Sequence, residues 1–146
     1  MSIHPFVLKD QYGKDFVSTA HPEQWMLLSF HPLAWTGVCT EQMKRLEVLY
    51  SRWEQIGVIP VGISVDSVPC KKAWSESMGL QKLRILSDFW PHGEVARGFD
   101  AFVEERGIAT RATVIVGAGL KVLASFETSP GEARDFSAYR EVITAL

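Results

Sequence analysis

The sequence predicts an α/β fold in which a central mixed β-sheet is flanked by helices on both faces. Residues 25–30 and 58–63 are continuous apolar runs of strand length, which is typical of strands covered on both sides. Between them, residues 38–55 place their apolar side chains at helical spacing. Two later β-rich runs, 112–116 and 120–126, are joined by a glycine-rich turn and indicate an antiparallel hairpin. A β-α-β unit followed by a hairpin requires both parallel and antiparallel strand pairs.

The N-terminal part precedes this unit with two short β-like pieces, residues 6–8 and 16–18, separated by a turn at Gly13. The long helix 38–55 has Thr36 as its expected N-cap, since a hydroxyl can accept from the first free N–H groups. Helix 38–55 is therefore expected to begin directly after the loop that follows the first buried strand.

Gly57 follows the first helix as a stop signal. The next strand, 58–63, contains Pro60, which has no N–H to donate and is expected to weaken the ladder. A second helix is expected to open near Pro69, with Asp66 or Ser67 as its cap. It should end at the glycine in position 79.

The last third of the chain supplies the remaining elements. We expect a short strand at 85–86, a helix through 95–99 and, after the hairpin, a terminal helix that starts at Asp135 or Ser137 and ends at Leu146. The order βαβα, hairpin, helix is the thioredoxin plan.

The whole chain, 1–146, is expected to form one domain, because no repeat, linker-like stretch or low-complexity segment divides it. Basic and acidic residues are mixed along the chain and the net charge is −2, so nothing indicates nucleic acid or a membrane surface as a partner. The apolar runs are far shorter than a membrane span. The first residues lack the basic start and apolar stretch of a signal peptide, which favours a cytoplasmic location.

The two cysteines, Cys39 and Cys70, are too few for a disulfide scaffold in a chain of this length. In a reducing compartment such residues are reactive, metal-binding or simply buried. The histidines and cysteines show none of the usual metal-ligand spacings, so neither a metal nor another cofactor is expected.

Cys39 lies in the first turn of the predicted helix 38–55, where unpaired N–H groups and the helix dipole favour negative charge. A thiolate there could attack a peroxide, provided that donors hold the two oxygens as charge spreads along the O–O bond. Thr36 offers a hydroxyl, and Pro32 lacks an N–H and could limit solvent access. By its position alone, a single cysteine at a helix start is more often an inert, partly buried residue.

The string Pro32-x-x-x-Thr36-x-x-Cys39 resembles the active-site signature of the peroxiredoxins. Four further segments are similar to family segments in the expected order, namely residues 66–68, 86–93, 107–113 and 130–132. The resemblance therefore covers nearly the whole chain. Within the family, the chain is most similar to the one-domain alkyl hydroperoxide reductase E type and more loosely to the bacterioferritin comigratory (Q) type.

The resemblance implies a thioredoxin-like fold and a thiol-dependent peroxidase that reduces hydrogen peroxide and organic hydroperoxides through a sulfenic acid on Cys39. It also implies that the Arg111 guanidinium lies beside the sulfur, and we expect Phe30 and Trp35 to wall the site. One departure is Gln42, which stands where many relatives carry glutamate.

The resemblance further implies a homodimer formed near the active-site loops, where Trp35 and Phe89 would suit the contact if exposed. A thiol reductant would be the other partner, either a thioredoxin, a glutaredoxin-like protein or a low-molecular-weight thiol.

The sulfenic acid must be reduced by a second thiol, and Cys70 is the internal candidate. It stands beside Pro69 with Lys71 and Lys72 next to it. A disulfide to Cys39 would require local unfolding of the first helix, because its Cα atoms must come within about 7 Å. The alternative is a one-cysteine enzyme whose Cys39 is reduced by an external thiol.

A different class of function is a thioredoxin-fold binding or sensor module in which oxidation of Cys39 acts as a switch. Catalytic turnover with a thiol reductant distinguishes the two. A thioredoxin-like oxidoreductase is disfavoured because Gln42 occupies the second position of a C-x-x-C motif. A cysteine protease is disfavoured because no accompanying His/Asn segment is present.

Overall fold

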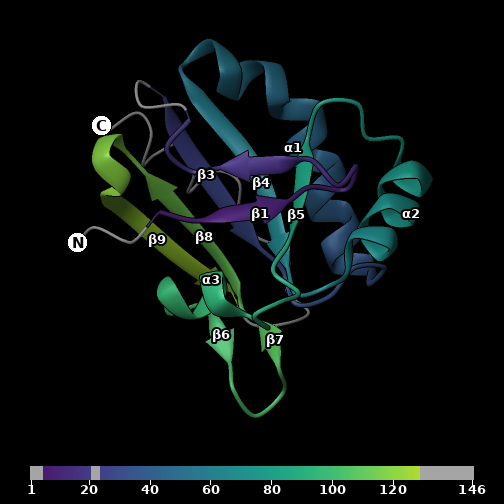
Figure 1. The fold of residues 1–146 in the computed structure, drawn as a ribbon. Coiled ribbons are helices and arrows are strands. Elements are labelled where there is room, and N and C mark those ends of the chain that lie inside the picture. The colour runs from purple at the N-terminus through teal and green to yellow at the C-terminus, as the bar shows by residue number, and fades with distance from the viewer. Residues whose placement is uncertain (1–4, 21–23, 129–146) are drawn as a thin grey trace.

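The computed structural model describes residues 5–20 and 24–128, and the helix expected from Asp135 or Ser137 to Leu146 lies outside them. Within this part, seven strands form one sheet in the order β2-β1-β5-β4-β3-β8-β9 (Figure 1). Its strands are β1 (Val7–Lys9), β2 (Asp15–Val17), β3 (Trp25–Phe30), β4 (Val58–Ser64), β5 (Arg84–Ser87), β8 (Arg111–Val116) and β9 (Val122–Thr128). The helices are α1 (Gly37–Gln55), α2 (Val68–Met78) and α3 (Glu94–Gly98).

The sheet is mixed, as predicted. Strands β3, β4 and β5 run parallel to one another, with α1 and α2 as the crossovers. The pairs β8–β3, β8–β9, β1–β5 and β1–β2 are antiparallel. Pro60 lies opposite Leu27 within β4, and the ladder to β5 begins only at the next residue, Val61. Strand β4 therefore tolerates the proline, because Pro60 precedes the part of the strand that pairs with β5.

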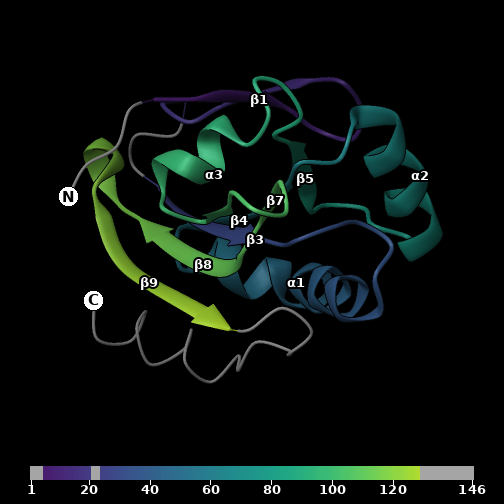
Figure 2. The same ribbon diagram turned by 90° about the horizontal axis from the view of Figure 1, so that it is seen from below.

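Helices cover both faces of the sheet, and Figure 2 shows α1 on one side and α3 on the other. Alternation of side chains along β3 explains the two cores. Leu27 packs in a cluster with residues of α1 and α2, whereas Met26 and Leu28 pack in the cluster that contains Ala96 of α3 and the β1–β2 hairpin. The same alternation decides which side chains face α1, and hence which can reach Cys39.

The helix ends agree with the sequence signals. Ser67 is the N-cap of α2 and accepts from the backbone N–H of Cys70, and Gly79 ends the helix in the left-handed conformation. Thr36 occupies the N-cap position of α1, but its side chain makes no capping hydrogen bond. It donates instead to the carbonyl oxygen of Leu33 at 3.1 Å.

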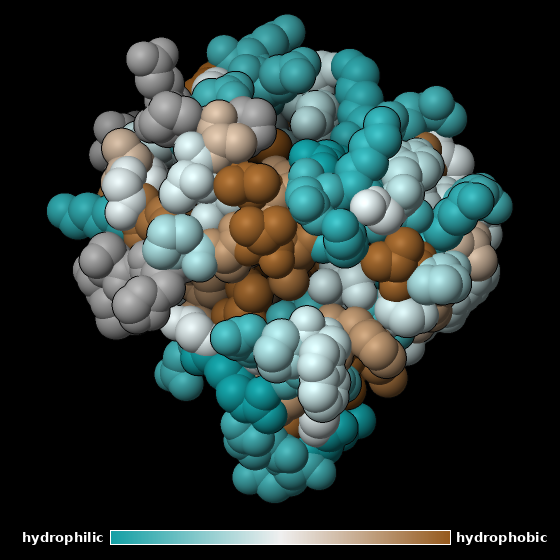
Figure 3. All heavy atoms as spheres, viewed as in Figure 1, coloured by the Kyte–Doolittle hydropathy of each residue, from teal (hydrophilic) through white to brown (hydrophobic). Residues whose placement is uncertain are grey.

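Two details of the C-terminal half differ from the prediction. The second hairpin strand begins at Val122 and not at residue 120, because Ala118–Leu120 form a 3-10 turn in which Leu120 has a positive φ. A separate two-stranded ribbon, β6 (Phe102–Val103) with β7 (Ile108–Ala109), has no counterpart in the sequence prediction. Its strands are too short for apolar and polar residues to alternate visibly in the sequence. The tip of the ribbon is hydrophilic, as Figure 3 shows at the bottom of the molecule, so it resembles a loop in the sequence.

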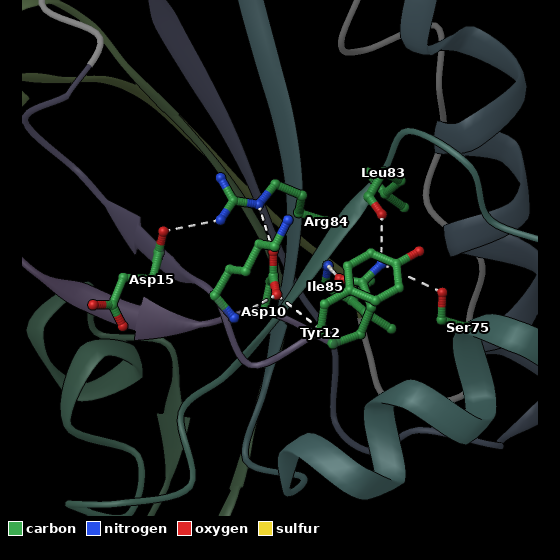
Figure 4. Close-up of polar contacts among 9 residues, drawn as sticks. Asp10, Tyr12, Asp15, Ser75, Leu83, Arg84 and Ile85 are labelled. Carbon is green, nitrogen blue, oxygen red and sulfur yellow. Dashed lines mark hydrogen bonds and ion pairs between the residues drawn. The ribbon is translucent and has the colours of Figure 1, made fainter.

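A buried polar cluster fastens the N-terminal hairpin to the sheet and to α2 (Figure 4). The Gln11 side chain donates to the carbonyl oxygen of Leu83 at 2.9 Å and to the Ser75 hydroxyl at 3.3 Å, and it accepts from the N–H of Ile85 at 2.9 Å. Beside it, the buried Asp10 carboxylate accepts from the Arg84 guanidinium at 2.8 Å. The sequence shows no pattern that marks Gln11 as buried.

We predict that Gln11→Ala lowers the free energy of unfolding by about 2–3 kcal/mol, because it leaves buried backbone groups without their partner. Urea denaturation measures the change, and Gln81→Ala, at an exposed glutamine, is the matched control with an expected change near zero. Equal effects of the two substitutions would contradict the role given to this cluster.

Candidate active site

Cys39 is the third residue of α1 and is completely buried. It follows a loop, residues 31–36, that begins where β3 ends. The early N–H groups of a helix have no intrahelical acceptor, so the sulfur lies where negative charge is favoured. The sequence predicted this placement.

Arg111 is the first residue of β8, and its Nη1 atom lies 3.5 Å from the Cys39 sulfur. Strand β8 pairs with β3 up to Thr113 opposite Ser29, which leaves Arg111 at the carboxyl end of β3. Ile115 on the same strand packs in the core of α1, and residues of one strand at even spacing share a face. The alternation of β8 therefore directs Arg111 toward α1.

Arg111 is 2% exposed, yet no carboxylate pairs with its guanidinium among the described residues. Its Nε atom also has no hydrogen-bond partner in this part of the chain. A buried cation requires a counter-charge or good acceptors. The Cys39 sulfur, as a thiolate, can supply the charge, and the unpartnered N–H remains available for a further acceptor.

Asp66 holds the loop that carries Cys39. Its Oδ2 atom accepts from the N–H of Ala34 at 2.8 Å and from the Ser64 hydroxyl at 2.5 Å. Its carbonyl oxygen accepts from the Ser87 hydroxyl at 2.6 Å. Asp66 thus does not cap α2 but joins the loop to the ends of β4 and β5, a positioning role that the sequence did not reveal.

The other predicted site residues lie on this loop or directly next to it. Pro32 is buried and Thr36 is exposed, with the Thr36 hydroxyl proton directed at the carbonyl of Leu33. Trp35 is 54% exposed and has a φ of +71°. The prediction that Phe30 walls the site is wrong, because its ring packs on the opposite face of the sheet.

That opposite face holds Phe99, whose ring centroid lies 5.6 Å from that of Phe30. Gln42, one turn after Cys39, is buried.

Cys70 lies in the first turn of α2 and is partly buried, and both cysteines are free thiols. Its sulfur donates to Asp66 Oδ1 at 3.9 Å. Trp74, one turn further along α2, donates from its indole to the hydroxyl of Thr40 at 3.1 Å. The face of α2 that carries Cys70 and Trp74 is thus turned toward the first turn of α1.

Lys71 was noted in the sequence only as a basic neighbour of Cys70, but the structure buries it completely. Its Nζ atom lies 3.0 Å from Nε2 of His31, which is also fully buried. Burial lowers the pKa of Lys71 from its ordinary value of 10.5 to about 7, against an opposing effect of Asp66 and other acidic groups nearby. Lys72, by contrast, is exposed.

No helix in residues 5–20 and 24–128 is long and apolar enough to cross a membrane. The same residues contain no group of three or more His, Cys, Asp or Glu side chains able to hold a metal ion.

A buried thiol at a helix start, in contact with a buried arginine from the neighbouring antiparallel strand, is an arrangement suited to thiol redox chemistry on a thioredoxin-like fold. The comparisons with known proteins give the family. Residues 2–125 match the AhpC/TSA family, and the chain belongs to that family.

Curated relatives agree with this assignment. Alkyl hydroperoxide reductase E of Mycobacterium tuberculosis is 35% identical over 121 residues, which cover 83% of this chain and 78% of the relative. Alkyl hydroperoxide reductase C of Salmonella typhimurium is 28% identical over 141 residues, 92% of this chain and 74% of that protein.

Solved structures show the same fold. The crystal structure of Enterococcus faecalis AhpC has a TM-score of 0.90 at 22% identity, covering 99% of this chain and 89% of the other. That of the peroxidoxin BcpB from Mycobacterium tuberculosis has a TM-score of 0.85 at 24% identity, covering 100% and 96%. The thioredoxin-like fold predicted from the order of elements is confirmed.

We predict that Lys71→Met stabilises the protein below neutral pH. In the unfolded chain Lys71 titrates at its ordinary pKa of 10.5, and in the folded chain its pKa is about 7. At about pH 6 both states hold the proton and the full cost of burying an ammonium applies, so an apolar replacement raises the free energy of unfolding by about 1–3 kcal/mol. As the pH rises between the two values the folded state loses the proton, and the advantage of the variant fades.

Urea denaturation across this pH range measures the effect, with Lys72→Met as the control at an exposed lysine. A gain that stays constant with pH, or that Lys72→Met reproduces, would contradict the account of Lys71.

Proposed function

We propose that this chain reduces hydrogen peroxide and organic hydroperoxides with the thiolate of Cys39. The enzyme is a thiol-dependent peroxidase of the AhpC/TSA family. The observation that carries the assignment to Cys39 is its contact with Arg111, a buried guanidinium that no carboxylate neutralises in the described part of the chain.

The thiolate attacks one oxygen of the peroxide. A sulfur–oxygen bond forms, the O–O bond breaks, and the second oxygen leaves as hydroxide or alkoxide, which takes a proton to give water or an alcohol. The sulfur is oxidised by two electrons to a sulfenic acid, and the peroxide is reduced by two. As negative charge moves onto the leaving oxygen, the unpartnered Nε–H of Arg111 is a donor available to hold it.

Thr36 and Pro32 complete this proposal. Because the Thr36 hydroxyl donates to Leu33, its oxygen has lone pairs left to accept from the O–H of a hydroperoxide. Pro32 is buried in the same loop, where its ring excludes water without adding a competing donor. The complete burial of Cys39 fits a small reacting group better than a bulky one.

Reduction of the sulfenic acid requires a thiol, which is either Cys70 or an external reductant. Cys70 lies on the α2 face that meets α1, but its S–H donates to Asp66 and must lose that proton before the sulfur can attack. Cys39 is fully buried, so its helix turn must open for either thiol to reach it. The two routes leave products of different mass.

We also propose that the protein forms a homodimer and works in the cytoplasm, whose reductants would regenerate the thiol. The exposed aromatic side chains Trp35, Phe89 and Trp90 support the dimer. They stand on loops that follow β3 and β5, at the edge of the sheet where Cys39 lies.

The assignment predicts that Cys39→Ser abolishes peroxide reduction in the presence of dithiothreitol or thioredoxin, whereas wild type and Cys70→Ser both consume peroxide. Intact mass after one equivalent of peroxide then separates the routes. A loss of two hydrogens that Cys70→Ser abolishes indicates an internal disulfide, and a stable sulfenic or sulfinic acid indicates an external reductant. Thiol-dependent turnover by Cys39→Ser would contradict the assignment, and oxidation of Cys39 without turnover would indicate a sensor module.

A second prediction concerns Arg111. Arg111→Met keeps much of the side-chain volume but removes the donors, and we expect the second-order rate constant with hydrogen peroxide to fall by about 10²–10³-fold. Arg97→Met, at an exposed arginine that pairs with Glu104, is the control and should leave the rate unchanged. Stopped-flow tryptophan fluorescence measures both, and equal rates in the two variants would remove Arg111 from the chemistry.

A further inference from the structure

The buried pair of Lys71 and His31 has no part in the chemistry proposed above. Below about pH 7 Lys71 is an ammonium, which only donates, so Nε2 of His31, 3.0 Å from Nζ, then presents its lone pair. The ring proton then lies on Nδ1, which is 3.4 Å from the carbonyl oxygen of Ser29. The His31 ring is thus held by a contact at each of its two nitrogens, and it fixes the position of the Lys71 amine in the core.

Such a cation is costly to the fold. Lysine is almost never fully buried unless it is paired with an acid, and here its hydrogen-bond contact at 3.0 Å is with the imidazole of His31. The indole of Trp74 adds one favourable contact, with its centroid 5.8 Å from Nζ. An apolar side chain of similar size would pack there without the cost of removing water from an ammonium. A functional role would therefore explain why a lysine occupies this position.

The pair lies against the helix face that carries Cys39. A Cβ atom built on Gly62 would lie 2.5 Å from Sδ of Met43 and 3.3 Å from Cε1 of His31, so the two side chains flank the same point of β4. Met43 is four residues after Cys39 and shares its face of α1. Lys71 reaches this place from α2, whereas Arg111 reaches the sulfur from β8.

Four groups act on the charge of Lys71 across the elements packed around it, and each favours the ammonium when ionised. They are Asp66 before α2, Cys70 on α2, Cys39 on α1 and Asp88 after β5. Interaction between two ionisable sites is reciprocal. If the Cys39 thiolate favours a charged Lys71, then a charged Lys71 favours the Cys39 thiolate by the same free energy.

We propose that Lys71, held in place by His31, is a positioning residue that stabilises the Cys39 thiolate through space and so sustains peroxide reduction at neutral and mildly acidic pH. The inference rests on the proposed function of Cys39. Arg111 provides charge in contact with the sulfur, and Lys71 provides a second charge in a region of low dielectric, where Coulomb interactions reach further than in water.

The lowered pKa of Lys71, about 7, sets the range in which this support operates. Below that pH the ammonium is present, and this is where an ordinary thiol is protonated and unreactive. Above it Lys71 loses its charge, but an alkaline medium by itself ionises the thiol. The stabilisation of the thiolate by Lys71 is therefore largest at the pH values where an ordinary thiol is protonated.

The test is the pH profile of the reaction with hydrogen peroxide in wild type, Lys71→Met and Lys72→Met. Stopped-flow fluorescence gives the rate of sulfenic acid formation, and ultraviolet absorbance of the thiolate gives its population. We expect the Lys71→Met profile to move to higher pH by on the order of one unit, which lowers the rate at about pH 6 roughly tenfold. The two variants should converge at high pH, and Lys72→Met should follow wild type. A Lys71→Met profile that coincides with that of Lys72→Met overturns the inference.

A second measurement does not depend on the Lys71 variant. Carbon-13 NMR of the Lys71 side chain follows its titration in wild type and in Cys39→Ser. We expect Lys71 to lose its proton at lower pH in Cys39→Ser, because the thiolate that favours the ammonium is gone. Identical titrations in the two proteins overturn the inference.

The two failures are distinguishable. If wild type reacts with peroxide no faster than a free cysteine, the proposed function fails. If wild type reacts fast while Lys71→Met keeps its profile, the inference about Lys71 fails alone.

Discussion

The contact between Arg111 and the Cys39 sulfur is the constraint on which the site depends. A buried arginine with no carboxylate partner in the described part of the chain is tolerable only if another group balances its charge. The sulfur can do so as a thiolate, and the fold keeps the two groups in contact. Antiparallel pairing of β8 with β3 puts Arg111 where β3 ends, and the loop that leaves β3 leads directly into the helix that carries Cys39. The Asp66 carboxylate then fixes that loop to the sheet.

Much of this arrangement could be predicted from the sequence because it depends on local patterns. Continuous apolar runs identified β3 and β4, and helical spacing identified α1. Ser67 and Gly79 marked the ends of α2 through their own cap chemistry. For Cys39 and Arg111, the motif resemblance predicted that the two residues meet, and the structure shows the contact. Alternation along β8 supplies the physical reason that the sequence alone did not.

The features that the sequence did not reveal arise from contacts between distant elements. His31 and Lys71 are 40 positions apart, and each resembles a surface residue when read in its own segment. Asp66 follows a strand and precedes a helix, which suggested a cap, but its carboxylate turned to the loop because Ser67 already fills the capping position. Phe30 was expected at the site from its closeness in sequence, yet strand alternation sends it to the other face of the sheet. In each case the outcome depends on which face a side chain takes once the sheet is assembled.

The structure therefore places a buried thiol in contact with the buried Arg111 guanidinium, and it buries a second basic side chain, Lys71, on α2. The cost of burying these basic groups is explained if the thiol reacts as an anion with a substrate that accepts hydrogen bonds from Arg111. The most direct test is the second-order rate constant of the reduced wild-type protein with hydrogen peroxide at neutral pH, measured against a free cysteine peptide under the same conditions. The account predicts a rate constant at least about a hundredfold greater than that of the peptide. A rate constant equal to that of the peptide would contradict it.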